Sequence, residues 1–299
     1  MRIGIDLGGT KIEIIALDAA GNTLLRRRMP TPADDYRKTV AAIKMLVCES
    51  EQQLGQHGTI GIGIPGSPSP TTALIRNANS TCLNTRPLLE DIRQLLQRDV
   101  RIANDANCFT LSEATDGAAA GAASVFGIIL GTGTGGGVVI NGKLHEGKNL
   151  VAGEWGHNPL PWMSTEEFPG PDCWCGKRGC IETFLSGPGL SGQYQRITGE
   201  ALSAEEIMQA VQRGGQTAER LLQQYEDQLA RALASVINLL DPECIVLGGG
   251  LSNFHRLYEN VPPLLPKYVF SDSVSTSIVP PLHGDSSGVR GAAWLWPAE

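Results

Sequence analysis

The sequence predicts an α/β fold made of two lobes with a cleft between them. Two observations carry this prediction. Apolar strand-like runs alternate with amphipathic helical patterns over 299 residues, 41% of them hydrophobic, which is enough for more than one core. In addition, a strand, a glycine-rich loop and a second strand occur in that order twice, within residues 3–17 and again within 124–141. This repeat indicates a duplicated domain.

The first elements form a hairpin. Isoleucines at alternate positions predict a strand at 3–7, and a second strand follows at 12–17. The glycine turn between them, at 8–11, can bring backbone amides close to a phosphate. It is not a Walker loop, because the spacing Gly-x-x-x-x-Gly-Lys-Ser/Thr is absent and no helix follows. An ordinary hairpin turn remains the alternative.

The next elements alternate as an α/β fold requires, with helices at 36–53 and 88–97 and strands at 60–64 and 100–102. The last of these strands leads into Asn104 and Asp105, and an alanine-rich helix follows to about residue 121. A strand end that feeds a helix is where α/β folds place site residues. The alternative for Asp105 is a helix N-cap, the commonest role of Asp at such a position.

The second glycine loop, at 131–137, lies between strands predicted at 124–130 and 138–141. It fits the dinucleotide pattern Gly-x-Gly-x-x-Gly formally, but a strand follows instead of a helix, which excludes that interpretation. In the last third of the chain, a capping box at Ser203 opens a helix. The remaining predicted elements are helices at 218–240 and 289–296 and a strand at 243–247.

A histidine and three cysteines between residues 153 and 183 form a complete ligand set for a tetrahedral zinc ion. They are His157, Cys173, Cys175 and Cys180. Four protein ligands leave no open coordination position, so the predicted metal is structural and not catalytic. The alternatives for these thiols are a disulfide or unpaired core cysteines.

Two carboxylates flank the predicted zinc ligands. Glu154 lies just before His157, and Glu182 lies just after Cys180, so closing the metal site draws both into one region. Rigidly held carboxylates are good acceptors for the hydroxyls of a sugar.

The composition excludes several classes of partner. A net charge of −7 with no long Lys/Arg block argues against nucleic acid and anionic membranes. No apolar run reaches the roughly 18 residues of a membrane span, and the N-terminus lacks a signal-peptide pattern. Four further cysteines in mostly apolar contexts suggest buried thiols in a reducing cytoplasm: Cys48, Cys82, Cys108 and Cys244.

Together these motifs resemble the ROK sugar kinases and repressors along the whole chain. The motifs are residues 6–11, 104–107, 131–133, 154–157, the cysteine run ending at Glu182, and 247–250. Within the family, residues 77–81, 155–162 and 284–296 look most like bacterial fructokinases, also called manno(fructo)kinases.

The resemblance implies two ribonuclease-H-like, actin-like ATPase lobes around a central cleft that holds ATP and sugar. The small lobe would comprise residues 1–119 and 285–299, and the large lobe 120–284 with a zinc loop at 153–183. The implied activity is an ATP- and Mg²⁺-dependent fructokinase that also accepts mannose, with structural Zn²⁺, working as a cytoplasmic homodimer. An N-acetylglucosamine kinase or a glucokinase is the alternative.

Residue roles follow by position from the same resemblance. Asp105 is the catalytic base, and Asp6 holds magnesium through water. The expected ATP and phosphate contacts are Gly4, Ile5, Asp6, Leu7, Gly8, Gly9, Thr10, Lys11, Gly131, Thr132, Gly133, Thr134, Gly249 and Gly250. The expected sugar contacts are Gly66, Asn79, Asn104, Asp105, Glu154, His157 and Glu182.

Two competing functions are less favoured by the sequence. A sugar-sensing repressor of this family would carry a helix-turn-helix before Asp6, where only five residues stand, and the acidic charge agrees with its absence. A zinc hydrolase would need an open metal position, which four ligands close.

Overall fold

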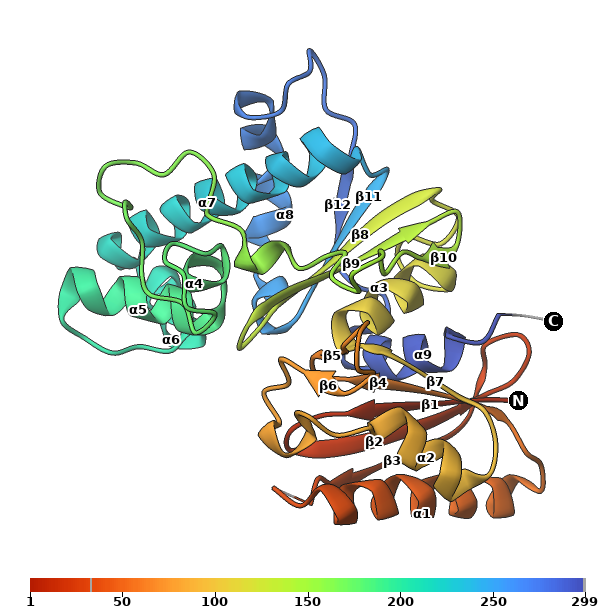
Figure 1. Cartoon of the computed structure of the whole chain (residues 1–299). Coiled ribbons are helices and arrows are strands. Elements are labelled where there is room, and N and C mark those ends of the chain that lie inside the picture. The colour runs from red at the N-terminus through yellow and green to blue at the C-terminus, as the bar shows by residue number, and fades with distance from the viewer. Residues whose placement is uncertain (33, 298–299) are drawn as a thin grey trace. The chain divides into compact units, whose positions relative to one another are not determined.

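The computed structural model describes residues 1–32 and 34–297 of the chain (Figure 1). The chain divides into two compact units. The first contains residues 1–121, 137–152 and 282–299, and the second contains 122–136 and 153–281. Each unit is an α/β assembly with its own helices.

The first unit is built on a five-stranded sheet of order β3-β2-β1-β4-β7. Its strands are β1 (Arg2–Leu7), β2 (Lys11–Leu17), β3 (Thr23–Pro30), β4 (Thr59–Ile64) and β7 (Val100–Asn104). Strand β2 is antiparallel to β1 and β3, whereas β1, β4 and β7 run parallel. The parallel strands therefore end at the same edge of the sheet.

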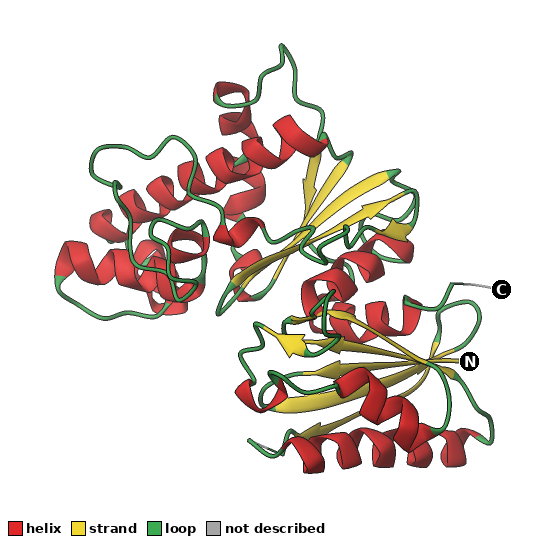
Figure 2. Ribbon diagram, in the orientation of Figure 1, coloured by secondary structure: helices red, strands yellow, loops and turns green. Residues whose placement is uncertain are grey.

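Helices cover both faces of this sheet (Figures 1 and 2). One face carries α1 (Tyr36–Leu54) and α2 (Leu88–Leu96), and the other carries α3 (Asp105–Thr115) and α9 (Ser287–Trp294). Side chains of β2 point alternately to the two faces of the sheet, so this strand contributes to a hydrophobic core on each face. Ile12 and Ile14 pack on the α1 side, whereas Ile15 and Leu17 pack on α9.

Helix α9 rests directly on the backbone of β1 and β4, because glycines remove the side chains between them. A Cβ at Gly4 would lie 2.0 Å from Val289 O, and one at Gly61 would lie 1.8 Å from Ala292 O. No side chain fits at these distances, so the glycines of these strands are required by packing.

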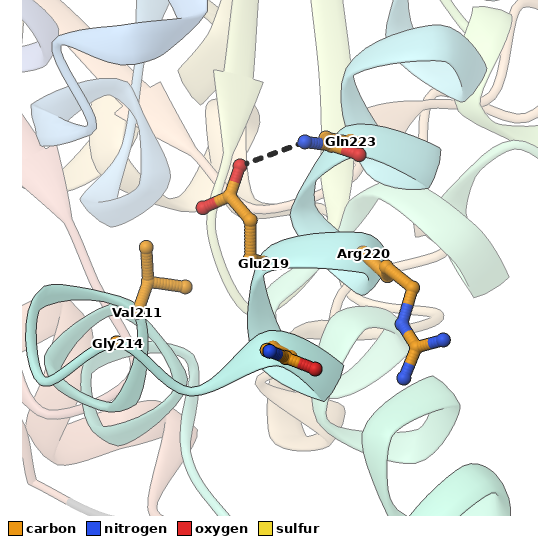
Figure 3. Close-up of a pocket in the computed structure, with 6 residues that line it drawn as sticks. Val211, Gly214, Glu219, Arg220 and Gln223 are labelled. Atoms are coloured by element: carbon orange, nitrogen blue, oxygen red, sulfur yellow. Dashed lines mark hydrogen bonds between the residues drawn. The ribbon is translucent and has the colours of Figure 1, made fainter.

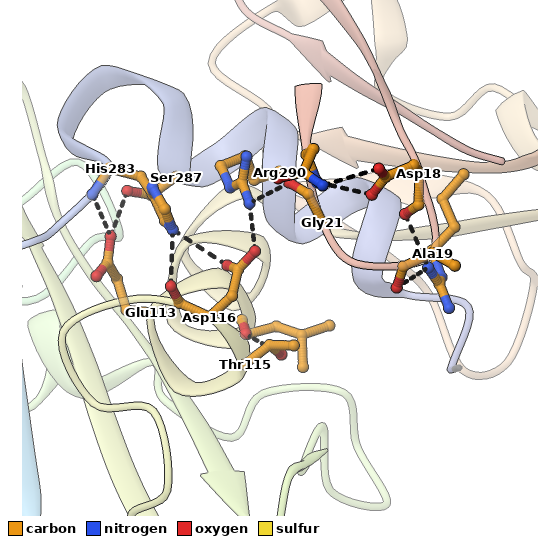
Figure 4. Close-up of polar contacts among 12 residues, drawn as sticks. Asp18, Ala19, Gly21, Glu113, Thr115, Asp116, His283, Ser287 and Arg290 are labelled. Carbon is orange, nitrogen blue, oxygen red and sulfur yellow. Dashed lines mark hydrogen bonds and ion pairs between the residues drawn. The ribbon is translucent and has the colours of Figure 1, made fainter. Parts of the chain in front are cut away.

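Buried polar contacts fasten the segment that leads into α9 (Figure 4). The side chain of Glu113 on α3 is fully buried and accepts hydrogen bonds from Ser287 Oγ at 2.6 Å and from the Leu282 amide at 2.9 Å. Asp116, one turn later, accepts from His283 Nε2 at 3.1 Å and pairs with Arg290. These contacts fix the position of α9 on the first unit's sheet.

The second five-stranded sheet has the order β10-β9-β8-β11-β12. Its strands are β8 (Ser124–Leu130), β9 (Thr134–Ile140), β10 (Lys143–Leu144), β11 (Cys244–Gly248) and β12 (Ser277–Val279). Strand β11 runs parallel to both β8 and β12. The short strands β5 (Ser67–Pro68) and β6 (Ile75–Arg76) form a separate ribbon in the first unit.

The helices of the second unit lie mainly between residues 182 and 267. They are α4 (Glu182–Leu185), α5 (Gly187–Thr198), α6 (Ala204–Gln212), α7 (Gln216–Leu240) and α8 (Arg256–Asn260). Short 3-10 helices occur at Thr81–Leu83, Trp155–His157, Gly250–Asn253, Pro262–Lys267 and Gly284–Ser286. No helix in the described parts of the chain is long and apolar enough to cross a membrane.

The element boundaries of β9 and α3 differ most from the sequence-based expectation, whereas the other predicted boundaries agree to within about two residues. Strand β9 begins at Thr134, not at Val138, so the glycine run continues as strand and the loop is only 131–133. Helix α3 ends at Thr115 instead of near residue 121, because Glu113 Oε2 accepts the Ala118 amide at 2.8 Å and draws the chain into a turn.

Candidate functional site

The first glycine turn closes the hairpin of β1 and β2 as predicted. The Gly8 amide donates to Lys11 O at 3.0 Å, and Thr31 Oγ1 donates to Gly8 O at 2.7 Å. Gly9 and Thr10 are exposed at the tip, whereas the side chains of Ile5 and Leu7 are buried in the core. Backbone amides, and not these apolar side chains, are the groups that the turn can offer to an anion.

Asp6, at the end of β1, lies in an acidic and largely desolvated environment. The pKa of Asp6 is raised from 3.8 to about 6. Burial is the largest cause, and the negative charges of Asp105 and Glu13 add to it. A Cβ on Gly288, in the first turn of α9, would lie 3.7 Å from the Asp6 carboxylate, so a larger residue there would crowd it. A buried carboxylate in an acidic environment is suited to a divalent cation such as Mg²⁺, whose charge would stabilise the ionised form.

Asn104 connects the end of β7 to two neighbouring segments, the start of α3 and the turn at Gly66. Its Oδ1 accepts the Ala106 amide at 2.9 Å as the N-cap of α3, and its Nδ2 donates to Gly66 O at 3.1 Å. Gly66 has a φ of +71°, and a Cβ there would lie 2.3 Å from Arg76 O. The sequence-predicted residues Gly66 and Asn104 are therefore in direct contact.

The carboxylate of Asp105 is exposed next to this cap, and its Oδ1 accepts the Ala106 amide at 2.8 Å. The helix N-cap is thus Asn104, one residue before the position considered in the sequence alternative. Asn79 is exposed in the loop before Ser80, and Ser80 Oγ lies 3.4 Å from a Cβ built on Gly9. The Asn79 loop therefore lies beside the tip of the first hairpin.

The second glycine loop is fastened from two sides within the second unit. The Gly131 amide donates to Gly133 O at 3.0 Å, and Gly131 O accepts the Gly187 amide at 2.8 Å. The Thr134 amide donates to Glu182 Oε2 at 2.9 Å. The loop is held in shape by residues that follow the predicted zinc ligands.

Gly249 and Gly250 follow β11, which is the parallel neighbour of β8. Gly249 has a φ of +82°, and a Cβ there would lie 2.4 Å from Leu130 O, directly before the second glycine loop. A Cβ at Gly250 would meet no heavy atom within 4 Å. The structure thus brings Gly249 and residues 131–133 to the carboxyl ends of neighbouring parallel strands, where α/β folds commonly bind ligands.

The four predicted zinc ligands converge. Their ligand atoms all lie within 4.8 Å of one another, with His157 Nδ1 at 3.7 Å from Cys173 Sγ and Cys175 Sγ at 3.6 Å from Cys180 Sγ. A tetrahedral zinc ion with Zn–S bonds near 2.3 Å places its sulfur ligands roughly 3.8 Å apart. A disulfide would need a distance of about 2.05 Å. The donor set therefore fits zinc and not a disulfide.

The sugar-contact candidates of the second unit are close to this cluster in the chain, since His157 belongs to it, Glu154 lies three residues earlier and Glu182 lies two residues after Cys180. The short helix Trp155–His157 packs so tightly on the glycine loop that a Cβ at Gly156 would lie 1.9 Å from Thr134 O. Because His157 directs Nδ1 at the thiols, its Nε2 is the ring nitrogen left for another partner. Glu154, directly before this helix, is exposed.

No pattern in the sequence predicts a role for Trp174, which stands between two of the predicted zinc ligands, Cys173 and Cys175. Its Nε1 donates to Glu182 Oε1 at 2.7 Å, and its ring meets His157 edge to face with centroids 4.9 Å apart. An indole between two cysteines has no periodicity that would reveal such a contact, so only the three-dimensional structure identifies it.

A cavity of about 410 Å³ lies elsewhere in the second unit, between α6 and α7 (Figure 3). Its lining is made of Val211, Gly214, Gln216, Glu219, Arg220 and Gln223. None of these is a candidate site residue, and Glu219 is engaged by Arg256 and Gln223. The lining of this cavity contains no residue of the second glycine loop and none of the cysteine cluster.

Comparison with known proteins places the chain among sugar kinases. The model of the ROK family matches residues 2–299. A curated N-acetyl-D-glucosamine kinase of Pectobacterium atrosepticum is 42% identical over 99% of this chain and 98% of the relative. A ROK hexokinase of Thermus thermophilus has a similar structure, with a TM-score of 0.87 and 29% identity over 98% of this chain and 96% of that one.

A second solved structure is a ROK family glucokinase of Streptomyces griseus in complex with glucose and AMPPNP. Its TM-score is 0.77, with 27% identity and 98% of each chain covered. The predicted fold class, two ribonuclease-H-like, actin-like ATPase lobes, is confirmed by these matches.

The comparisons correct the predicted fructokinase. The curated relatives at 39–42% identity over nearly the full chain are named N-acetyl-D-glucosamine kinases, which was the alternative. The physical reason for the error is that carboxylates and an imidazole that accept ring hydroxyls suit any hexose. The likeness to fructokinases was based on residues 77–81, 155–162 and 284–296. These segments carry no side-chain chemistry that is unique to fructose.

Proposed function

The chain belongs to the ROK family, and from that premise we propose that it is an ATP-dependent kinase whose acceptor sugar is N-acetyl-D-glucosamine. The observation that carries the kinase chemistry is the pair of glycine hairpins together with the carboxylates Asp6 and Asp105. The choice of sugar rests on the names of the curated relatives.

In this proposal Asp105 is the catalytic base at the acceptor hydroxyl. The proposal is supported by the position of Asp105, which is the exposed first residue of α3, directly after β7, with Asn104 as the N-cap of that helix. Phosphoryl transfer has a loose transition state, so one carboxylate that takes the proton late is sufficient. The neighbouring contact from Asn104 to Gly66 keeps this edge rigid.

Asp6 would hold Mg²⁺ through water, and the ion would neutralise charge on the phosphates of ATP. Each hairpin loop, at residues 8–11 and at 131–134, would supply backbone amides to phosphate, while Gly249 and Gly250 would lie by the adenosine. Gly4 would not contact ATP through a side chain. Its role is in packing, because the absence of a side chain makes room for α9 on β1.

Glu154, His157 and Glu182, all in the second unit, would bind sugar hydroxyls. In the first unit, Asn104, Gly66 and Asn79 are the residues whose contact with sugar we propose by family resemblance. The zinc ligands hold the residues of the second unit in place: His157 Nδ1 faces the thiols, which leaves Nε2 for a hydroxyl. The zinc ion itself would supply structure and no reactive group, since its four ligands fill the coordination sphere.

A coupled assay of ADP release tests the proposal over a panel of N-acetyl-D-glucosamine, glucose, mannose and fructose. We expect kcat/KM for N-acetyl-D-glucosamine to exceed that of each other sugar at least tenfold, about 1.4 kcal/mol in transition-state binding. A higher kcat/KM for one of the other sugars would contradict the choice of N-acetyl-D-glucosamine but not the proposed kinase activity. No ADP release with any sugar would contradict the kinase. Light scattering tests the homodimer that the family resemblance implies.

A further inference from the structure

The carboxylate of Glu182 is held at both oxygens. Oε2 accepts the Thr134 amide of the second glycine loop at 2.9 Å, and Oε1 accepts Nε1 of Trp174 at 2.7 Å. A carboxylate with two fixed donors has one orientation, because rotation about its terminal bond would break both hydrogen bonds. Each oxygen keeps a further lone pair for another donor.

The Trp174 side chain is itself held in place although it is 67% exposed. Its backbone lies between Cys173 and Cys175, and the Cys173 amide donates to Lys177 O at 2.8 Å. Its ring meets the His157 ring edge to face, at an interplanar angle of 86°. A large apolar ring left in solvent would normally be free to change rotamer, so these contacts call for an explanation.

We infer that Trp174 is a positioning residue, which orients Glu182 toward the sugar and keeps Glu182 bonded to the glycine loop. The indole N–H sets the carboxylate plane through Oε1, and Oε2 then remains aligned with the Thr134 amide. The sugar-binding part of this inference rests on the proposed function; the link to the glycine loop does not.

The geometry of Gly133 supports this role for Glu182. A Cβ at Gly133 would lie 2.7 Å from Glu182 Oε2, so the loop has no side chain where the carboxylate sits. Glu182 also begins α4, directly after Cys180 and Ile181. A rotation of its carboxylate would therefore be felt in the loop proposed to bind phosphate.

The first test measures amide hydrogen exchange without any sugar or nucleotide. Trp174→Phe keeps a ring beside His157 but removes the N–H donor. We expect the Thr134 amide to exchange roughly tenfold faster in this variant, with zinc content and Tm unchanged. Trp162→Phe is the matched control, since Trp162 is also exposed in the second unit and stacks on Tyr268. Unchanged exchange at Thr134, or loss of zinc in Trp174→Phe, would overturn the inference.

The second test measures sugar binding by calorimetry, with N-acetyl-D-glucosamine and glucose as probes. We expect Kd for the sugar to rise about three- to tenfold in Trp174→Phe. In a Glu182→Ala background the same substitution should add no further loss, because Trp174 acts through Glu182. Additive losses would show that Trp174 touches the sugar itself and would overturn the positioning role. A wild-type protein that binds neither sugar contradicts the proposed function, whereas the exchange result at Thr134 then still decides the inference.

Discussion

The Thr134 amide donates a hydrogen bond of 2.9 Å to Glu182 Oε2, and this single contact joins the second glycine loop to the segment that follows the cysteine cluster. Residues proposed for phosphate and for sugar are thereby mechanically connected inside one unit. A change on either side of this hydrogen bond should affect the other.

Gly133→Ala tests that connection from the loop side. The added Cβ would lie 2.7 Å from Glu182 Oε2, so the carboxylate must move and its bond to Thr134 must lengthen. We expect the free energy of unfolding to fall by roughly 1–3 kcal/mol and the KM for the sugar to rise. Gly131→Ala is the control for stability, because its Cβ would meet only Ile129 Cγ2 at 3.9 Å. Equal unfolding free energies for the two variants would contradict the role of this close approach.

Asp105→Asn tests the proposed catalytic base. We expect kcat to fall by roughly 10²–10⁴, with nearly unchanged binding of sugar and ATP, because only proton transfer is removed. Steady-state kinetics and calorimetry measure the two quantities separately. Asp99→Asn is a matched control, as an exposed aspartate directly before the same strand. Near-full turnover in Asp105→Asn would mean that the residue only supports the start of α3.

The core elements could be predicted from the sequence because their patterns repeat with the right period. Ile3, Ile5 and Leu7 alternate as a strand does, and β1 and β2 pair antiparallel as the predicted hairpin requires. The four predicted zinc ligands between His157 and Cys180 were chosen by residue type and spacing, and their side chains do converge.

Other features depend on packing that a single sequence does not reveal. The glycines at 135–137 look like loop residues, but β9 takes them into the sheet, where Gly137 leaves no room for a side chain beside Ala106 O. Helix α5 was not predicted, because its glycines and serines have low helix propensity. The preferred sugar depends on groups that accept hydroxyls of any hexose, so residue chemistry alone did not decide it.

Zinc analysis tests the cysteine cluster. We expect one tightly bound zinc ion per chain, and Cys175→Ser should lower both the zinc content and the affinity for the sugar before that for ATP. The reason is that Glu182 and Trp174 are positioned by the same loop. Cys48→Ser is the control, because Cys48 lies outside the cluster and is exposed; the expectation that it is a buried thiol was wrong, since it lies on the solvent side of α1. A fully active wild-type protein without zinc would sink this prediction.

Asp6→Asn tests the electrostatics at the end of β1 through stability. The folded-state pKa of Asp6 is raised from 3.8 to about 6, chiefly by burial and then by Asp105. The folded state therefore binds this proton more tightly than the unfolded state, and wild-type stability falls as pH rises through this window. Asn carries no charge at any pH, so the variant does not lose stability at this position as pH rises. Above about pH 7 we expect Asp6→Asn to exceed wild type in unfolding free energy by on the order of 2 kcal/mol, and the difference to shrink below about pH 4.

Urea unfolding in magnesium-free buffer at several pH values measures this difference, since a bound cation would mask the repulsion. Asp18→Asn provides a control of opposite sign. Hydrogen bonds from Asn22 hold the pKa of Asp18 below its usual value, so its carboxylate stabilises the fold above that value and the benefit is lost as pH falls. The Asp18 variant should thus be the less stable protein at neutral pH. A pH-independent difference between Asp6→Asn and wild type would refute the raised pKa, whereas one that grows with pH supports the cost of a buried negative charge, which a cation at Asp6 would offset.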